Sequence, residues 1–393
     1  MGQAFMWAGL ASLIFLQSVS TYKLVCYYTN WSQYRPQGGR FVPEAIDANL
    51  CTHIIYAFAN VSNDQVNHAE WNDDSTYETL NHLKTINPHL KILLSVGGFT
   101  AGSKPFSKMA ASPVRRSNFV NSVVRYLQEN HFDGFDLDWV SPEERDKNRL
   151  VYLVKDLSIQ FKREAVKKKN EKLILSVAVQ AGKEKLNKGY DVRAISEYAD
   201  FINFLTYDFH GSWDGVTGHG SPLYKGKDDL GSSSYYNVDY SVKYLKTKGA
   251  PAEKIMMGIP TFGRTFTLAS QQTGVGAAIS GAGTPGPFTQ EAGILSYYEI
   301  CQFNNGAKKE RIEEQAVPYS YKGTQWVGYE DVTSVQAKVQ YMKENNLGGI
   351  VIWAIDLDDF SGSACHQGNY PLTGAVKEEL NKRAEAQNEY IKI

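Results

Sequence analysis

The sequence predicts an α/β fold, a (β/α)8 (TIM) barrel with a small α+β domain inserted between the seventh strand and the seventh helix. Three observations predict it: eight short apolar runs, amphipathic segments between most of them, and a Gly-, Ser- and Thr-rich stretch late in the chain. The chain has 393 residues, of which 42% are hydrophobic, so it can bury a large core. A barrel alone takes about 250 residues, and the inserted domain accounts for the surplus.

The eight apolar runs are short and rich in β-branched and aromatic residues, as expected for strands of a buried parallel sheet. They are KLVCYYT (23–29), THIIYAFA (52–59), KILLSVGG (91–98), GFDLDW (134–139), KLILSVAV (172–179), FINFLTYD (201–208), KIMMGIP (254–260) and GGIVIWAID (348–356). Between them, segments such as 77–87, 116–130 and 149–169 carry apolar residues at the i, i+3, i+4, i+7 spacing of amphipathic helices. Eight such units close into a barrel whose active site lies at the C-terminal ends of the strands.

The chain divides into a leader, a barrel in two parts, an insertion and a tail. Residues 1–21 are expected to be a signal peptide, because an apolar stretch is followed by small polar residues. Residues 22–265 and 338–385 are assigned to the barrel, 266–337 to the α+β insertion and 386–393 to the tail. No later apolar run approaches the roughly 18 residues of a membrane helix. We therefore expect a secreted, extracellular protein that does not act in a membrane.

The charge balance argues against charged partners. There are 41 Lys and Arg residues against 42 Asp and Glu, a formal net charge of −1, so no field gathers nucleic acid or an anionic membrane. An uncharged polar partner fits better. No phosphate-binding loop and no metal-ligand spacing occurs in the sequence, so we expect neither a cofactor nor a metal.

The cysteines fit an oxidising compartment. They are Cys26, Cys51, Cys301 and Cys365, and none has the C-x-x-C spacing of a zinc or redox site. Three pairings into two disulfides are possible, and the grouping along the chain favours Cys26 with Cys51 and Cys301 with Cys365. N-glycosylation sequons begin at Asn30 and Asn60, and both are candidate sites in a secreted chain.

The stretch DGFDLDWV places carboxylates inside an apolar strand. Because alternate residues of a strand share a face, Asp136, Asp138 and Val140 point into the barrel. Two neighbouring carboxylates in a dry interior repel, so one tends to hold a proton or to need hydrogen-bond donors. A structural hydrogen-bond network would explain them, but so would a series that tunes an acid at the rim. The rim position is Val140, which cannot be that acid.

These residues resemble glycoside hydrolase family 18, the chitinases. DGFDLDWV is similar to the family signature D-G-x-D-x-D-W-E with its final Glu replaced by Val140. Further motifs resemble the mammalian-type chitinase and chitinase-like group and cover nearly the whole chain: YKLVCYYTNW (22–31), SVGG (95–98), YDFHGSW (207–213), GIPTFGRTF (258–266) and WAIDLDDF (353–360). The resemblance implies the barrel with its insertion, the same two disulfides, and a cleft for β-1,4-linked N-acetylglucosamine.

The resemblance also implies that catalysis is lost. In family 18 the acetamido oxygen of the substrate is the nucleophile, an aspartate orients it, and the glutamate is the general acid and base. Asp138 matches the aspartate, but Val140 has neither a proton nor a lone pair. General acid–base help of roughly 10²–10⁴-fold is therefore missing from both steps. Glu143 and Glu144 follow Pro142 on the next loop and are not expected to replace it.

Binding groups remain, because sugars stack their apolar faces on aromatic rings and pair their hydroxyls with fixed polar groups. The carbohydrate-binding residues that the resemblance assigns are Tyr27, Trp31, Phe58, Glu70, Trp71, Gly97, Gly98, Phe99, Thr100, Asp138, Ser141, Leu205, Tyr207, Asp208, Arg264 and Trp353. Alternative interpretations are a core position for Trp353 and a simple strand-to-helix turn for the two glycines.

Several cleft positions depart from the active-chitinase pattern and predict a relaxed groove. Phe99 and Thr100 stand where the family commonly has Trp and Asn, and Ser141 replaces the usual Tyr. Leu205 replaces a Met, and Phe262 replaces a Tyr. These changes favour a protein that binds sugar without turnover.

The sequence therefore predicts a secreted, chitinase-like lectin, expected to be a monomer, that binds chito-oligosaccharides or related N-acetylglucosamine glycans without hydrolysing them. Two alternatives stay open. One is a signalling or matrix protein with a vestigial glycan cleft that acts through a protein receptor. The other is a weak residual chitinase or transglycosylase.

Overall fold

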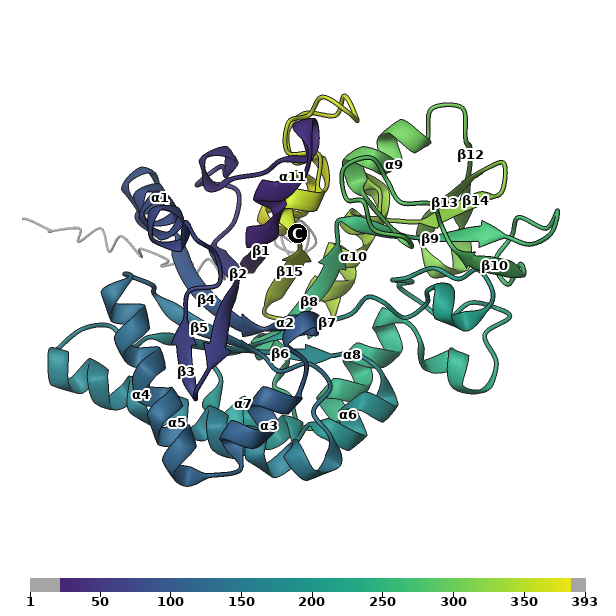
Figure 1. Ribbon diagram of the computed structural model, residues 1–393. Coiled ribbons are helices and arrows are strands. Elements are labelled where there is room, and N and C mark those ends of the chain that lie inside the picture. The colour runs from purple at the N-terminus through teal and green to yellow at the C-terminus, as the bar shows by residue number, and fades with distance from the viewer. Residues whose placement is uncertain (1–21, 383–393) are drawn as a thin grey trace, which may run out of the picture.

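The computed structural model describes residues 22–382, so the expected signal peptide (1–21) and tail (386–393) lie outside the described residues. Eight parallel strands form a barrel (Figure 1). They are β1 (Lys23–Thr29), β2 (His53–Ser62), β4 (Lys91–Gly97), β5 (Gly134–Asp138), β6 (Ile174–Gln180), β7 (Phe201–Leu205), β8 (Ile255–Pro260) and β15 (Gly349–Trp353). Because β1 pairs with both β2 and β15, the sheet closes, and the prediction of a (β/α)8 barrel is confirmed.

Helices surround the barrel (Figure 1). They are α1 (Asp73–Ile86), α2 (Gly98–Ala101), α3 (Lys104–Ala110), α4 (Pro113–Glu129), α5 (Lys147–Lys168), α6 (Lys183–Gly189), α7 (Val192–Tyr198), α8 (Val238–Thr247), α10 (Val332–Glu344) and α11 (Pro371–Asn381). Helix α4 shows why the local sequence folds in this way. The Ser112 side chain caps its first turn by accepting from the Arg115 N–H, and Pro113 fits the first helical position. The apolar stripe that includes Phe119, Val123 and Leu127 is buried.

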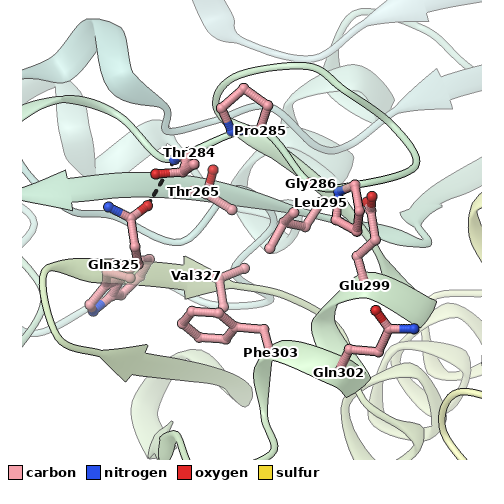
Figure 2. Close-up of a pocket in the computed structure, with 12 residues that line it drawn as sticks. Thr265, Thr284, Pro285, Gly286, Leu295, Glu299, Gln302, Phe303, Gln325 and Val327 are labelled. Carbon is pink, nitrogen blue, oxygen red and sulfur yellow. Dashed lines mark hydrogen bonds between the residues drawn. The ribbon is translucent and has the colours of Figure 1, made fainter.

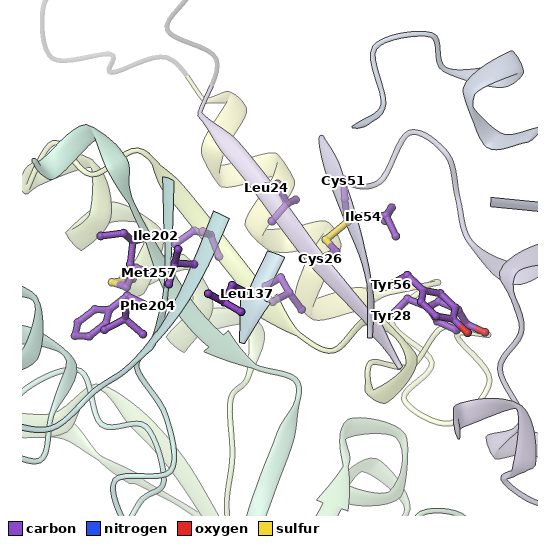
Figure 3. Packing of buried hydrophobic residues seen from close by; sticks show 14 of the residues in the cluster. Leu24, Cys26, Tyr28, Cys51, Ile54, Tyr56, Leu137, Ile202, Phe204 and Met257 are labelled. Carbon is purple, nitrogen blue, oxygen red and sulfur yellow. A yellow bond between two sulfur atoms is a disulfide. The ribbon is translucent and has the colours of Figure 1, made fainter. Parts of the chain in front are cut away.

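The main core lies between the strands and these helices. Leu137, Ile202, Phe204 and Met257 point out of the barrel and are fully buried there (Figure 3). Trp139 shares this face of the chain and stacks on Phe106 at 5.6 Å. The residues between them therefore face the barrel interior, as strand alternation predicts.

A second, antiparallel sheet lies between β8 and α10, at one side of the barrel (Figure 1). Its elements are β9 (Phe262–Leu268), β10 (Ile279–Ala282), β11 (Ile294–Ser296), α9 (Tyr297–Phe303), β12 (Lys308–Ile312), β13 (Val317–Lys322) and β14 (Gln325–Gly328). The order is β10-β9-β14-β13-β12, with β11 also on β9. Phe266, Leu268 and Trp326 form its small core.

The elements of this inserted sheet differ in extent from the expected range 266–337. The sheet begins at Phe262, because only Thr261 separates β8 from β9 and no loop lies between the two strands. Helix α10 begins at Val332, where the Asp331 side chain accepts from the Ser334 N–H, and it packs against β15 and α11 of the barrel. The first strand of the insertion and the first turns of α10 therefore lie across the expected boundaries.

The two disulfides have the predicted pairing. Cys26 of β1 is joined to Cys51, with a Cα–Cα distance of 6.2 Å, and Cys301 of α9 is joined to Cys365, with a distance of 5.1 Å. The second bond links the insertion to the segment that leads into α11. Strand β3 (Gln65–Asn67) pairs antiparallel with the C-terminal end of β2 and forms a hairpin with it. Within residues 22–382, no helix combines the length and hydropathy needed to cross a bilayer.

Candidate functional site

Asp136 is the buried centre of a hydrogen-bond network inside the barrel. Its carboxylate accepts from the Tyr27 hydroxyl at 2.8 Å, from Ser95 at 2.7 Å, from Ser176 at 2.6 Å and from the Asn203 amide at 3.0 Å. Burial raises the pKa of Asp136, and the four hydrogen bonds oppose this shift. The donors come from β1, β4, β6 and β7, so Asp136 joins strands on both sides of β5. A structural hydrogen-bond network, one of the two explanations that the sequence left open for these carboxylates, therefore accounts for Asp136.

Asp138 lies one step nearer the mouth of the barrel and is bound differently. It is 5% exposed, and no described residue in the range 22–382 donates a hydrogen bond to its side chain. Burial, followed by the charge of Asp136, raises the pKa of Asp138 to about 8. Asp138 is therefore a carboxyl group that holds a proton near neutral pH and has free hydrogen-bonding capacity.

Val140 occupies the rim beyond Asp138. It is 9% exposed, and its side chain can neither donate nor accept a proton. The nearby glutamates do not take its place. Glu143 forms an ion pair with Arg145 at 3.1 Å, and Glu144 is an exposed residue of the following 3₁₀ turn. The rim of β5 thus lacks a general acid.

Two glycines allow close packing beside these carboxylates. Gly97 has φ +114°, and a Cβ there would lie 2.0 Å from the Asp138 carbonyl oxygen. Gly98 has φ +77°, and a Cβ there would lie 2.4 Å from the Phe58 ring. Only glycine fits both the conformation and the space, so the end of β4 rests directly on the floor of the site.

Aromatic rings gather at the C-terminal ends of β15, β1 and β2. The Trp353 ring lies 4.9 Å from Tyr27, 6.0 Å from Phe58 and 6.4 Å from Trp31, measured between centroids. Trp31 stacks on Phe58 with an angle of 21° between the two ring planes, and the Trp31 residue is 42% exposed. Trp353 is half-buried, so this cluster presents an apolar platform next to Asp138. Such a platform suits the apolar face of a pyranose ring.

Polar groups at the ends of β7 and β9 lie near the aromatic cluster, since Tyr207 and Phe262 pack in the same cluster of side chains as Tyr27 and Trp353. The Arg264 Nε donates to Asp208 Oδ1 at 2.8 Å, and its guanidinium lies 5.1 Å from the centroid of the Trp213 ring. Tyr207 packs edge-on against Phe262 at 5.9 Å, and Leu205 ends β7 in a half-buried position. The Tyr207 hydroxyl is buried, and no described residue between 22 and 382 pairs with it. An unpaired buried hydroxyl costs about 1–3 kcal/mol, which a ligand oxygen would recover.

Four further predicted carbohydrate-binding residues lie outside the ring cluster. Trp71 is 86% exposed and Phe99 is 91% exposed, and Thr100 is exposed beside Phe99. Glu70 accepts from the Tyr34 hydroxyl at 2.5 Å. These side chains form an open outer rim, while the ring cluster and the polar groups at the ends of β7 and β9 form the inner part of the site.

The comparisons with known proteins agree with this geometry. The sequence profile described as "Glycosyl hydrolases family 18" matches residues 23–358. The chain belongs to glycosyl hydrolase family 18. It is 50% identical over 382 residues to human (Homo sapiens) chitinase-3-like protein 2, covering 97% of this chain and 98% of that protein. It is 46% identical over 391 residues to chitotriosidase-1 of Mus musculus, covering 98% and 84%.

Solved structures of family 18 proteins have the same fold. Human YKL-39 superimposes with a TM-score of 0.91 at 50% identity, covering 92% of this chain and 100% of that one. It is described as a pseudo-chitinase with retained chitooligosaccharide binding properties. The immunomodulatory active chitinase TsES1 of Trichuris suis superimposes with a TM-score of 0.90 at 42% identity, covering 91% and 100%. The family resemblance inferred from the motifs is confirmed.

The structure adds residues around the candidate site that the sequence analysis missed. Ser95, Ser176 and Asn203 each interrupt an apolar strand with one polar residue on its inner face, and that signal could have found them. Trp213 belongs to the quoted YDFHGSW motif but was not selected. Gln180 accepts hydrogen bonds from Ser141, and no pattern in the sequence pointed to it.

A cavity of about 250 Å³ in the inserted domain does not compete with this site (Figure 2). Leu295, Phe303 and Val327 contribute apolar walls. Its carboxylate, Glu299, accepts from the backbone N–H groups of Phe288, Thr289 and Ser296, so it is already used in folding. Among residues 22–382, no three His, Cys, Asp or Glu side chains are arranged to hold a metal ion.

Burial argues against a glycan at one of the two expected modification sites. Asn30 is 3% exposed, and its Nδ2 donates to the Phe58 carbonyl oxygen at 2.9 Å, so a glycan at Asn30 would replace a buried contact. Ser32 of the same sequon is buried and donates to the Thr29 carbonyl oxygen. Asn60 is exposed near the end of β2, where a glycan has room. We retain Asn60 as the candidate glycosylation site.

Proposed function

We propose that this protein is a secreted chitinase-like lectin that binds chito-oligosaccharides in the barrel cleft without hydrolysing them. One observation carries the proposal: aromatic rings and polar groups gather at the barrel mouth near Asp138, while the adjoining rim residue is Val140. Human YKL-39, a pseudo-chitinase with retained chitooligosaccharide binding, is 50% identical to this chain and supports the proposal. Secretion is supported by the two disulfides, which form in oxidising compartments.

The binding half of the proposal rests on groups that complement an aminosugar. Trp353 and Trp31 offer ring faces to the C–H faces of pyranose rings. Arg264 supplies N–H donors, and the buried Tyr207 hydroxyl has a free hydrogen bond to give. Asp138, which holds a proton near neutral pH, can donate to the acetamido oxygen or, when ionised, accept from the acetamido N–H.

The catalytic half rests on the missing proton donor. Cleavage of a glycosidic bond needs a proton for the leaving oxygen, because an alkoxide is a poor leaving group. Asp138 can still orient the acetamido group, but it lies one step inside the barrel mouth, and the rim position beyond it carries Val140. The sugar is therefore bound and released intact.

Calorimetry and an activity assay together test this proposal. We expect chitotetraose to chitohexaose to bind with measurable heat and with a change in tryptophan fluorescence, and we expect no release of fluorophore from a chitobioside. Trp353→Ala should lose most of the affinity while keeping the thermal unfolding midpoint within a few degrees. If millimolar oligomer gives no heat and no fluorescence change, the lectin function is wrong and a protein partner becomes the better hypothesis. Turnover at the rate of an active chitinase would overturn the non-enzymatic half.

A further inference from the structure

We propose that Gln180 is a further sugar-binding residue of the cleft, and that Ser141 holds its amide in the binding orientation. This inference rests on the proposed glycan function and deepens it. It assigns a neutral hydrogen-bond donor to the place in the cleft where Val140 offers none. The ligand it would contact is a hydroxyl or acetamido oxygen of an N-acetylglucosamine unit.

Strand register places Gln180 at the mouth of the barrel beside Val140. On β6, Ser176 points inward, because its hydroxyl reaches the buried Asp136 at 2.6 Å. Gln180 lies four residues further along and shares that inner face. The pairing of β5 with β6 sets Leu137 opposite Val177, and three more residues on each chain lead to Val140 and Gln180.

The orientation of the Gln180 amide follows from its partners. The backbone N–H of Ser141 donates to Gln180 Oε1 at 3.0 Å, and the Ser141 hydroxyl donates to the same atom at 2.9 Å. Because a backbone N–H can only donate, the amide atom facing it must be the oxygen. The Nε2 group therefore points away from Ser141. No acceptor for Nε2 occurs among the residues that the structure describes.

The Ser141 backbone prepares this contact before any ligand arrives. Ser141 has φ +51°, the left-handed conformation, just after the end of β5, and its N–H faces Gln180 of β6 there. Two donors on one oxygen restrain the long Gln180 side chain, so less conformational entropy is lost when a sugar binds. A restrained amide with two open N–H groups suits the oxygen acceptors of a neutral sugar. It cannot act as an acid, so it adds affinity without restoring catalysis.

Calorimetric titration with chitotetraose tests the role of Gln180. Gln180→Leu removes the donor and keeps the bulk, and we expect a dissociation constant about 3- to 10-fold weaker than that of the wild type. Gln180→Glu keeps an oxygen acceptor for Ser141 but loses the donor, so we expect a loss of similar size. Gln271→Leu changes an exposed glutamine of the inserted domain and should leave the dissociation constant unchanged.

A double-mutant cycle tests the positioning role of Ser141. Ser141→Ala removes one of the two donors to Oε1 and should weaken binding about 2- to 3-fold. Ser141→Ala combined with Gln180→Leu should bind no worse than Gln180→Leu alone, because the serine acts through the amide. Thermal unfolding of each variant checks that it is folded.

The outcomes separate this inference from the proposed function. If the wild type binds chitotetraose and both Gln180 variants bind equally well, the inference is overturned and the lectin function stands. Strictly additive losses in the cycle would overturn the positioning role of Ser141. A wild-type protein that does not bind at all would overturn the proposed function and this inference with it.

Discussion

Asp136 and Asp138 lie on the same face of β5, two residues apart, but within the described part of the chain only the Asp136 side chain is hydrogen-bonded. Four side chains from neighbouring strands donate to Asp136, and no described residue of the range 22–382 donates to Asp138. The two carboxyl groups therefore have different roles, although they have the same side chain and the same strand register. Asp136 joins the barrel strands together, and Asp138 is left for a ligand. The predictions below follow from this difference and from the neighbouring Val140.

Val140→Glu should give the protein measurable hydrolytic activity. The new carboxyl would stand at the rim beside Asp138, whose proton and charge can tune it. Release of fluorophore from a chitobioside measures the gain, and Val140→Gln is the matched control because it has the same length without an acid. A folded Val140→Glu variant that stays as inert as Val140→Gln would show that other cleft substitutions, such as Ser141, also prevent turnover.

Asp136→Leu should destabilise the protein by at least about 3 kcal/mol, because it leaves four buried donors without their acceptor. Urea unfolding followed by fluorescence measures this free energy. Glu171→Ala is the control: Glu171 forms an exposed pair with Lys91 at 3.2 Å, and its loss should change stability little. An Asp136→Leu protein as stable as the control would contradict the assigned role of the network.

Stability should depend on pH through Asp138. Its pKa is about 8 in the folded protein, raised from 3.8 by burial and by Asp136, so the folded state binds the proton more tightly than the unfolded chain. The contribution of Asp138 is fully present below about pH 4 and is lost as pH rises through about 8. Asp138→Asn cannot ionise. We therefore expect its free energy of unfolding to rise relative to the wild type between pH 4 and 8, by at most about 1.4 kcal/mol per pH unit.

The measurement for Asp138 is a series of urea unfolding curves for both proteins across this pH range. A difference between wild type and Asp138→Asn that stays constant with pH would contradict the raised pKa. The difference between the two proteins is used because groups that do not interact with Asp138 titrate equally in both and cancel from it.

Glycan attachment should be confined to Asn60. When the chain is expressed in a secretory cell, Asn60→Gln should remove the glycan mass from the secreted protein, and intact-mass spectrometry detects the loss. Asn30→Gln should leave that mass unchanged and lower the unfolding midpoint, because it disturbs the buried bond from Asn30 to the Phe58 carbonyl oxygen. Glycan mass lost on Asn30→Gln would show that Asn30 is modified and that this region folds differently.

The sequence by itself predicted the barrel, favoured the disulfide pairing that the structure contains and placed Val140 at the rim position. Strand alternation placed Asp136, Asp138 and Val140 on one inner face, because a side-chain period of two needs no information from the rest of the chain. The eight apolar runs located the strands, because local composition carries the signal of a buried strand. The start of the inserted sheet at Phe262 was not visible, because a single residue, Thr261, separates β8 from β9.

Only the tertiary structure decided which of these groups are paired. The Tyr27 hydroxyl reaches Asp136 across 109 residues of sequence, and no local pattern contains such a contact. Closure of the barrel likewise buries Asn30 against Phe58 and leaves Phe99 in solvent. It also brings Ser141 to Gln180, so that the amide oxygen of Gln180 faces Ser141 and Nε2 points away from it. Hydrogen-bond partners and burial depend on which segments meet in space, and local sequence preferences do not specify that meeting.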